Sequence, residues 1–393
     1  MPLDAAPRPT DLAPSLAIAR RRTPGPRAVA IWLFCMCGML LVMVSLGGAT
    51  RLTGSGLSIM EWAPLLGVLP PLSEAEWQRL YGLYQAIPQY SLVHQGFGIE
   101  GFKGIFWLEW AHRLWGRLLG LAFLAPLVAF AVRGAIDGRL ARRLGGLFLL
   151  GGLQGAIGWF MVASGFEADS TAVSPYRLVI HLAMALLLYS AILWTALGLW
   201  RQGSGLRGAE RRGGGGDAAP AIPGLRALTA ATASLVAVTI LAGGFVAGLR
   251  AGFTYNSFPF MDGRLVPDGY SMLRPFIRNL TENVAAVQFD HRLLATCTAL
   301  LALGTAAYGL RAGARGVVRT RLLLLGGAVL AQYALGVTTL LWVVPVSLGT
   351  AHQAMAVLVL TAALAALHAQ ARLVPGRQVQ TLATFPRPAA LIG

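Results

Sequence analysis

Charged residues are scarce in this sequence. Asp, Glu, Lys and Arg make up 12% of the 393 residues, whereas 56% are hydrophobic, and the mean hydropathy of +0.63 is too high for a typical soluble domain. Lys103 is the only lysine, so the net charge of +16 depends almost wholly on arginine. The arginines crowd every second loop, which indicates membrane topology rather than nucleic-acid binding. We therefore expect an integral membrane protein that contacts lipid and no nucleic acid.

Cysteine is also rare. Cys35, Cys37 and Cys297 all lie inside apolar runs, so we expect neither a disulfide nor a thiolate metal site. Gly54-Ser55-Gly56 is not a phosphate-binding loop, because no strand precedes it. Glycine, in contrast, is abundant, with 48 residues, and in membrane helices it lets neighbouring backbones approach closely.

Long apolar runs dominate what is present. Crossing about 30 Å of hydrocarbon takes about 20 residues of helix, and no strand pattern competes. The expected fold class is therefore all-α, a polytopic membrane protein with eight transmembrane helices. The predicted spans are about 28–48, 110–132, 144–164, 177–200, 227–248, 289–310, 321–343 and 349–370.

Arginine placement predicts the orientation. Because positively charged loops stay in the cytoplasm, both termini are expected there, and segments 49–108 and 249–288 on the opposite face. The alternative for the first span is a cleaved signal peptide, since Arg20, Arg21 and Arg22 precede it. The expected divisions are a cytoplasmic tail (1–27), two four-helix halves (28–200 and 227–370), a glycine-rich cytoplasmic linker (201–226) and a second tail (371–393).

The two halves share a pattern that supports two pseudo-symmetric four-helix bundles. Matching residues are offset by 196, 179, 178 and 171 positions, a drift that loop lengths would allow. An even number of spans per half gives both copies the same orientation. The matching positions are Gly47-Gly48 and Gly243-Gly244, His112-Arg113-Leu114 and His291-Arg292-Leu293, Gln154 and Gln332, and His181 and His352.

Four of the six histidines, His112, His181, His291 and His352, lie near the outer ends of four predicted helices. A lone histidine on an apolar face is usually a packed residue, but four at matching positions of a repeat favour a shared function. Facing imidazoles are axial ligands of haem iron, so two pairs predict two haem sites, one in each half.

Other metal sites fit less well. A structural zinc ion needs four ligands, and two histidines in each half would leave each zinc site incomplete. Convergence of all four histidines on one metal would require the two bundles to meet there. His94 and His368 have no repeat partners, and we interpret both as structural.

Three more charged residues accompany the histidines. Glu109 lies three residues before His112, so both share a helix face, and its repeat equivalent is Gln288. Glu109 either takes and gives protons at the rim of an apolar pocket or pairs with Arg113. Arg113 and Arg292 follow a histidine directly, where they would either bind haem propionates or anchor helices at the membrane interface.

The sequence resembles the haem A synthase family, in the form found in alphaproteobacteria and mitochondria. The similarity covers nearly the whole chain apart from the tails and the linker. It lies in GGATRLTGSGLSIMEWAPLLGVLPPLSEAEW from Gly47, FKGIFWLEWAHRLWGR from Phe102, GFTYNSFPFMDGRLVP from Gly252, ENVAAVQFDHRLLA from Glu282 and AHQAMAVLVL from Ala351.

The resemblance implies an oxidoreductase of the bacterial inner membrane. Its activity would be oxidation of the C8 methyl of haem O to the formyl group of haem A, which haem-copper terminal oxidases need. By the family motif, Glu109, His112 and His181 would line the substrate-haem half, and His291 and His352 would ligate the iron of a haem b cofactor. Another branch of the family has a cysteine pair in the first outer segment, and residues 49–108 contain none, so no thiol relay runs through this segment.

Partners are expected to include haem O synthase, oxidase assembly factors and an electron partner that the sequence does not identify. The main alternative function is a dihaem b-type membrane electron carrier, although such carriers usually stack haems toward both leaflets. A repeat-built transporter would need ionisable groups near the membrane midplane and broken helices, and the sequence shows neither clearly.

Overall fold

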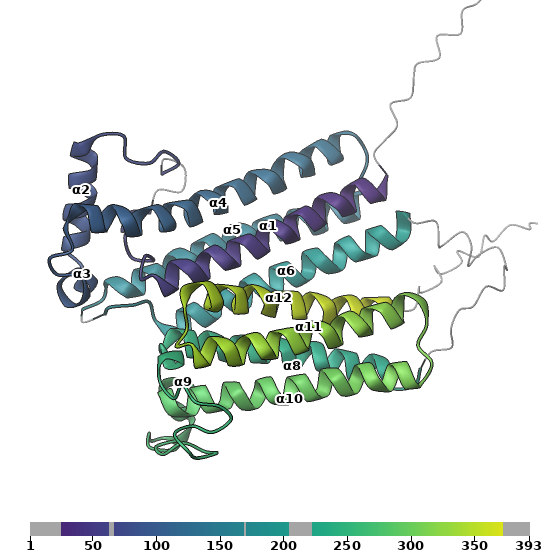
Figure 1. Ribbon diagram of the computed structural model, residues 1–393. Helices are drawn as coiled ribbons and strands as arrows, with labels where there is room; N and C mark the ends of the chain where they lie inside the picture. The colour runs from purple at the N-terminus through teal and green to yellow at the C-terminus, as the bar shows by residue number, and fades with distance from the viewer. Residues whose placement is uncertain (1–24, 63–66, 169, 204–221, 372–393) are drawn as a thin grey trace, which may run out of the picture. The chain divides into compact units, whose positions relative to one another are not determined.

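A computed structural model describes residues 25–62, 67–168, 170–203 and 222–371 (Figure 1). Most of both predicted tails and the glycine run 213–216 of the predicted linker lie outside these ranges. The described chain is helical and contains no named strand, apart from an isolated bridge between Met261 and Arg264.

In the part of the chain that the structure describes, eight helices are long and apolar enough to cross a membrane, which confirms the predicted all-α polytopic fold. Large apolar side chains on them face outward, among them Leu121, Leu149 and Leu300 at 63%, 72% and 67% exposure, as expected for helices that face lipid. The helices are α1 (Pro26–Leu52), α4 (Gly98–Val132), α5 (Gly138–Ala163), α6 (Pro175–Gly203), α8 (Leu225–Gly248), α10 (Val284–Arg311), α11 (Gly316–Leu341) and α12 (Val346–Ala369).

Short elements fill the two long connecting segments. In the first of these, between α1 and α4, lie α2 (Glu74–Gln85) and α3 (Pro88–Val93). A separate short element, η1 (Ser164–Phe166), follows α5. In the second lie η2 (Ala251–Phe253), η3 (Phe276–Arg278) and α9 (Asn279–Glu282).

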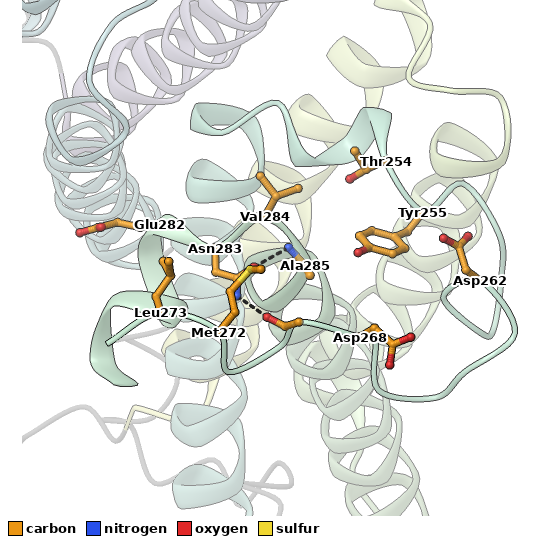
Figure 2. A pocket seen from close by; sticks show the side chains of 11 residues that line it. Thr254, Tyr255, Asp262, Asp268, Met272, Leu273, Glu282, Asn283, Val284 and Ala285 are labelled. Carbon is orange, nitrogen blue, oxygen red and sulfur yellow. Dashed lines mark hydrogen bonds between the residues drawn. The ribbon is translucent and has the colours of Figure 1, made fainter. Parts of the chain in front are cut away.

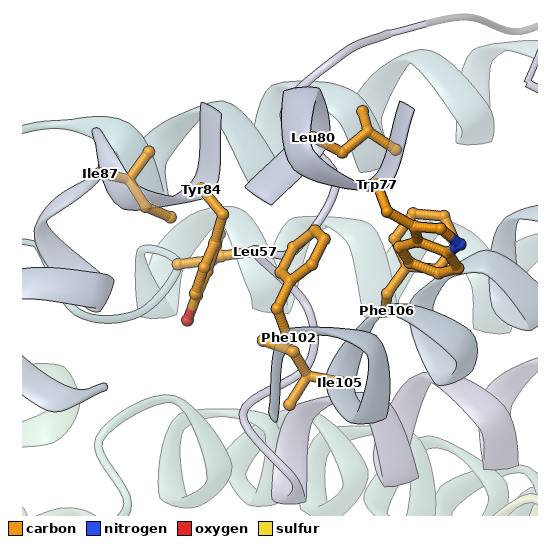
Figure 3. Packing of buried hydrophobic residues seen from close by; sticks show 8 residues of the cluster. All are labelled: Leu57, Trp77, Leu80, Tyr84, Ile87, Phe102, Ile105 and Phe106. Atoms are coloured by element: carbon orange, nitrogen blue, oxygen red, sulfur yellow. The ribbon is translucent and has the colours of Figure 1, made fainter. Parts of the chain in front are cut away.

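Helix α4 begins at Gly98, well before the predicted start near residue 110. With 35 residues it is about 52 Å long, more than the roughly 30 Å of hydrocarbon that a span must cross. Its first three turns continue because their apolar side chains are buried against protein. Three side chains of α2 meet three of α4, with Leu57 packed beside them (Figure 3): Trp77, Leu80 and Tyr84, and Phe102, Ile105 and Phe106.

Helices α1 and α4 are joined by a hydrogen bond that a proline makes possible. Pro126 has no N–H, so it leaves the carbonyl of Ala122, four residues earlier, without its helical donor. The indole N–H of Trp32 in α1 donates to that carbonyl at 2.9 Å. A second indole, of Trp115, donates in the other direction to the Met39 carbonyl, also at 2.9 Å.

The chain divides into two compact units. In the first, α1 packs against α4 and α4 against α5, together with residues 183–203 of α6. In the second, α8 packs against α10 and α12, and α11 packs against the same two helices, which gives a closed arrangement of four helices (Figure 1). The second unit also includes Ser174–Leu182, the beginning of α6.

Candidate functional site: a histidine pair and two docked loops

The sequence predicts all four histidines within the first turn or so of their helices, and the structure places three of them about one turn later. His181, His291 and His352 each lie within the first eight residues of their helices. His112 differs, because α4 begins earlier than predicted and His112 is the fifteenth residue of that helix. The prediction that His112 lies close to a helix start is therefore wrong.

Three histidines face a glycine on the neighbouring helix. A Cβ atom built on Gly47 of α1 would lie 3.2 Å from Nε2 of His112, and one on Gly243 of α8 would lie 3.0 Å from Cε1 of His291. In α11, a Cβ on Gly336 would lie 2.7 Å from Cε1 of His352. A larger residue at any of these positions would press on the imidazole, so glycine fixes how closely each ring approaches the next backbone.

His291 and His352 have the chemistry of a ligand pair within the second unit. His291 is in α10 and His352 in α12, both of the second unit. The Nδ1 atom of each ring is buried and has no hydrogen-bond partner. A buried polar atom without a partner is costly, about 1–3 kcal/mol, unless a ligand satisfies it. The donor set therefore fits bis-imidazole coordination of a haem iron.

Further unpartnered polar atoms lie in the same unit. Gln332 donates its side-chain amide to the carbonyl of His352 at 3.1 Å, but its Oε1 is buried without a partner. The same holds for Oγ1 of Thr350 and Nε of Arg292, which are near neighbours of the two histidines in sequence. A polar ligand between α10 and α12 would have protein donors and acceptors available to it.

Glu109 is fully engaged with protein donors in the first unit. Its side chain is 3% exposed. Oε2 accepts from the backbone N–H and the hydroxyl of Ser58, both at 2.7 Å, and from the N–H of Ile59 at 2.9 Å. Oε1 accepts from Nε of Arg113 at 3.0 Å and from Nη2 at 2.6 Å. Because a carboxylate offers about four acceptor sites, these five bonds saturate it.

Both arginines hold loop carbonyls. Arg113 donates to the carbonyls of Glu61, at 2.8 Å, and Ile59. Arg292 donates to those of Ser257, at 2.8 Å, and Tyr255. The loop positions differ by 196 residues, the same offset as between the paired glycines 47–48 and 243–244. Sequence reasoning missed this role, although GLSI (56–59) and GFTY (252–255) repeat at that offset.

Gln288 also binds the long connecting loop of its unit, but as a hydrogen-bond donor where Glu109 is an acceptor. Its amide donates to the carbonyls of Ala251, at 3.0 Å, and Thr254, at 2.7 Å. Glu109 accepts from loop N–H groups, and Gln288 donates to loop carbonyls. In each unit the residue three positions before the histidine thus fastens the long connecting loop to the helix that carries the histidine.

A cavity of about 620 Å³ opens beside the start of α10 (Figure 2). Asn283 caps this helix, since its Oδ1 accepts from the N–H of Ala285 at 3.0 Å. Its amide donates to the Gly269 carbonyl at 2.7 Å, which holds the loop against the helix. The cavity wall carries carboxylates, of which Asp268 pairs with Arg264 and Glu282 with Arg278, at 2.7 Å each.

His94 lies outside the histidine constellation, in the segment after α3. Its ring stacks on Phe97 with centroids 4.6 Å apart, and its Nδ1 lies 2.5 Å from the hydroxyl of Tyr84. Burial raises the pKa of that hydroxyl, and the negative charge of Glu109 raises it further. These contacts agree with the structural interpretation of His94.

No group of three or more His, Cys, Asp or Glu side chains gathers closely enough to hold a metal ion among the residues with described positions. A site with two imidazoles does not need such a group, because a porphyrin supplies the remaining iron ligands.

Comparison with known proteins identifies the family. Residues 30–364 match the model of a family described as cytochrome oxidase assembly protein. The chain belongs to this family. Its relatives include the heme A synthase of Granulibacter bethesdensis, 61% identical over 340 residues that cover 86% of each chain. The heme A synthase of Rhodospirillum centenum is 48% identical over 87% of this chain and 88% of its own. That of Nitrosospira multiformis is 46% identical over 86% and 92%. Such identity over most of both chains establishes the family resemblance that the motifs had predicted.

Proposed function

We propose that this membrane protein makes haem A by oxidising the C8 methyl of haem O. The methyl is hydroxylated twice, each step a two-electron oxidation whose electrons leave to an external redox partner with release of protons, and the resulting geminal diol loses water to give the formyl group. Family membership and the names of three relatives support this proposal.

In the second unit, His291 and His352 would hold a haem b cofactor. This assignment rests on their buried, unpartnered Nδ1 atoms. A haem bound there would supply reversible one-electron transfer. Arg292 has a buried Nε without a partner, which makes it a donor suited to a propionate at the edge of that haem.

Haem O binds at His112 and His181 in this proposal, and that pairing rests on the sequence alone. Gly47 leaves room for the His112 ring, and the loop at Ser58 and Ile59 is held over α4 by Glu109 and Arg113. Since the five bonds to Glu109 saturate its oxygens, we assign it to positioning this loop beside the substrate. Arg113 shares that task, with its guanidinium bound to Glu109 and to the loop carbonyls.

The protein acts in the bacterial inner membrane with both termini in the cytoplasm, as the arginine distribution predicts. The farnesyl tail of haem O would remain in lipid while the porphyrin enters the first half. Haem O synthase would supply the substrate, and oxidase assembly factors would receive the product.

The test uses single histidine variants of the full chain, purified from membranes. His291→Ala is expected to lose bound haem b, measured as the pyridine haemochrome, because one axial ligand is removed. His112→Ala is expected to keep haem b and to lose conversion of haem O. His94→Gln is the matched control and should keep both. A His291→Ala protein that retains haem b at the wild-type amount would contradict the assignment.

A further inference from the structure

The beginning of α6, which carries His181, packs within the second unit rather than with the rest of its own helix. Ser174–Leu182 cluster with α8, α10, α11 and α12, whereas residues from 183 onward cluster with the first unit. The position of His181 therefore depends on the neighbours that this short segment has in the second unit.

Two glycines of α8 let α6 approach closely. A Cβ on Gly244 would lie 3.0 Å from Cγ2 of Val179 and 3.2 Å from Cδ2 of Leu182, residues on either side of His181. A Cβ on Gly248 would lie 2.7 Å from Cβ and 2.9 Å from Cα of Pro175, the first residue of α6. Both distances from Gly248 are shorter than real contacts allow, and the proline ring is rigid. A side chain at position 248 would therefore displace the start of α6.

Tyr176 fastens the same turn by hydrogen bonds. Its hydroxyl donates to Oε1 of Glu282 at 2.8 Å and lies 2.8 Å from the hydroxyl of Thr281. Arg278 pairs with the same carboxylate at 2.7 Å and fixes its orientation. The Tyr176 ring meets Phe245 of α8 edge to face, with centroids 5.7 Å apart. Polar and apolar contacts thus hold one turn of α6 from two elements of the second unit.

Adjacent residues of α8 serve two histidines. Gly243 faces the ring of His291, and Gly244 faces the turn that contains His181. A side chain at Gly244 would therefore press on the turn that contains His181, and not on the His291 ring, which Gly243 faces.

We propose that α8 of the second unit sets the position of His181, with Gly244, Gly248 and Tyr176 as positioning residues for the substrate haem. This inference rests on the proposed function, in which His181 is an axial ligand of haem O. The second half thus has a structural role in substrate binding besides holding its own haem.

The experiment uses the full chain, purified with haem b from a host that makes no haem O. Ferric haem O is then added without a redox partner, and its electron paramagnetic resonance spectrum reports the orientation of its axial imidazoles. Gly244→Ala and Gly248→Ala are expected to shift the g values of the added haem and leave those of haem b unchanged. Conversion with a redox source should fall about tenfold or more, since small misplacements are amplified in rate.

Two further variants separate positioning from general packing. Tyr176→Phe keeps the ring and removes the hydroxyl, and it should shift the same signal by a smaller amount. Gly327→Ala on α11 adds a methyl group where nothing lies within 4 Å, and it should leave both spectra unchanged. A wild-type haem O spectrum in Gly244→Ala and Gly248→Ala would overturn the inference, as would equal perturbation of both haems.

His181→Ala distinguishes failure of the inference from failure of the proposed function. If His181→Ala leaves the haem O spectrum unchanged, His181 is not a ligand, and both the assignment and the inference fall. If His181→Ala abolishes the signal while the Gly244→Ala spectrum matches wild type, only the inference fails.

Discussion

Glu109 and Gln288 show how one residue position can do the same mechanical task with different chemistry. Each lies three residues before a histidine, and each binds the loop that follows the first helix of its half. The carboxylate needs a guanidinium beside it because it is buried, and Arg113 supplies one at 2.6 Å. The amide is neutral and needs no such partner. The asymmetry between Glu and Gln therefore does not require that Glu109 transfer protons.

Glu109→Gln tests this view. A glutamine amide would direct N–H groups toward the donors of Ser58, Ile59 or Arg113, so the loop should detach. Since a buried ion pair loses one partner, we expect the unfolding free energy to fall by about 3 kcal/mol. Conversion of haem O should fall with it. Denaturant unfolding in detergent and chromatography of extracted haems are the two measurements.

Gln288→Glu is the matched control, because it places a carboxylate opposite the carbonyls of Ala251 and Thr254. It should destabilise the second unit and reduce haem b content, whereas Glu109→Gln should leave haem b in place. Full conversion of haem O by Glu109→Gln would remove Glu109 from the site.

Only some of the roles of individual side chains could be predicted from the sequence. Glu109 and the four histidines stand out because ionisable groups are rare in apolar helices. The sequence offered the pairing of Arg113 with Glu109, which the structure contains, but not the loop carbonyls that Arg113 and Arg292 bind, because any residue type provides a carbonyl. The repeat singled out Gly47 and Gly243 but not the histidines they face, and Gly336 did not stand out among the 48 glycines.

Among the helices, α1 and α4 depend on each other through a proline. Pro126 leaves the Ala122 carbonyl without its helical donor, and the indole N–H of Trp32 donates to that carbonyl instead. The two helices are thereby fixed in axial register, which also fixes Gly47 of α1 against His112 of α4.

A double-mutant cycle measures this dependence. Trp32→Phe should destabilise the protein by about 1 kcal/mol, the usual net value of one hydrogen bond. In a Pro126→Ala background the helix itself supplies the donor, so the same change should have a smaller effect. Thermal unfolding of the four proteins in one detergent gives the coupling energy, and additive effects would contradict the account.

The sequence predicted all eight membrane helices, because each carries a long apolar run. It missed the true start of α4, since residues 98–109 mix polar and aromatic side chains. Their helical state depends on burial of Phe102, Ile105 and Phe106 against α2, a tertiary contact without a local signature. Amphipathic spacing at 77, 80 and 84 is visible in the sequence, but what it packs against is not.

For the whole molecule, the predicted division into residues 28–200 and 227–370 stays a prediction. The contacts add one element that it did not include, since Ser174–Leu182 pack with the second unit. A helix that begins in one unit and continues in the other cannot be predicted from hydropathy, because both parts are equally apolar. The loop contacts at an offset of 196 residues support a repeat, as do the glycine contacts of His112 and His291.

The central claim is that this chain converts haem O to haem A. The most direct test expresses it in a host that makes haem O but no haem A, and identifies the haems extracted from the membranes by chromatography. We predict that haem A appears with the wild-type chain and is absent with His112→Ala. A folded protein that carries haem b and leaves haem O unconverted, even with a redox source supplied, would contradict the claim and favour a dihaem electron carrier.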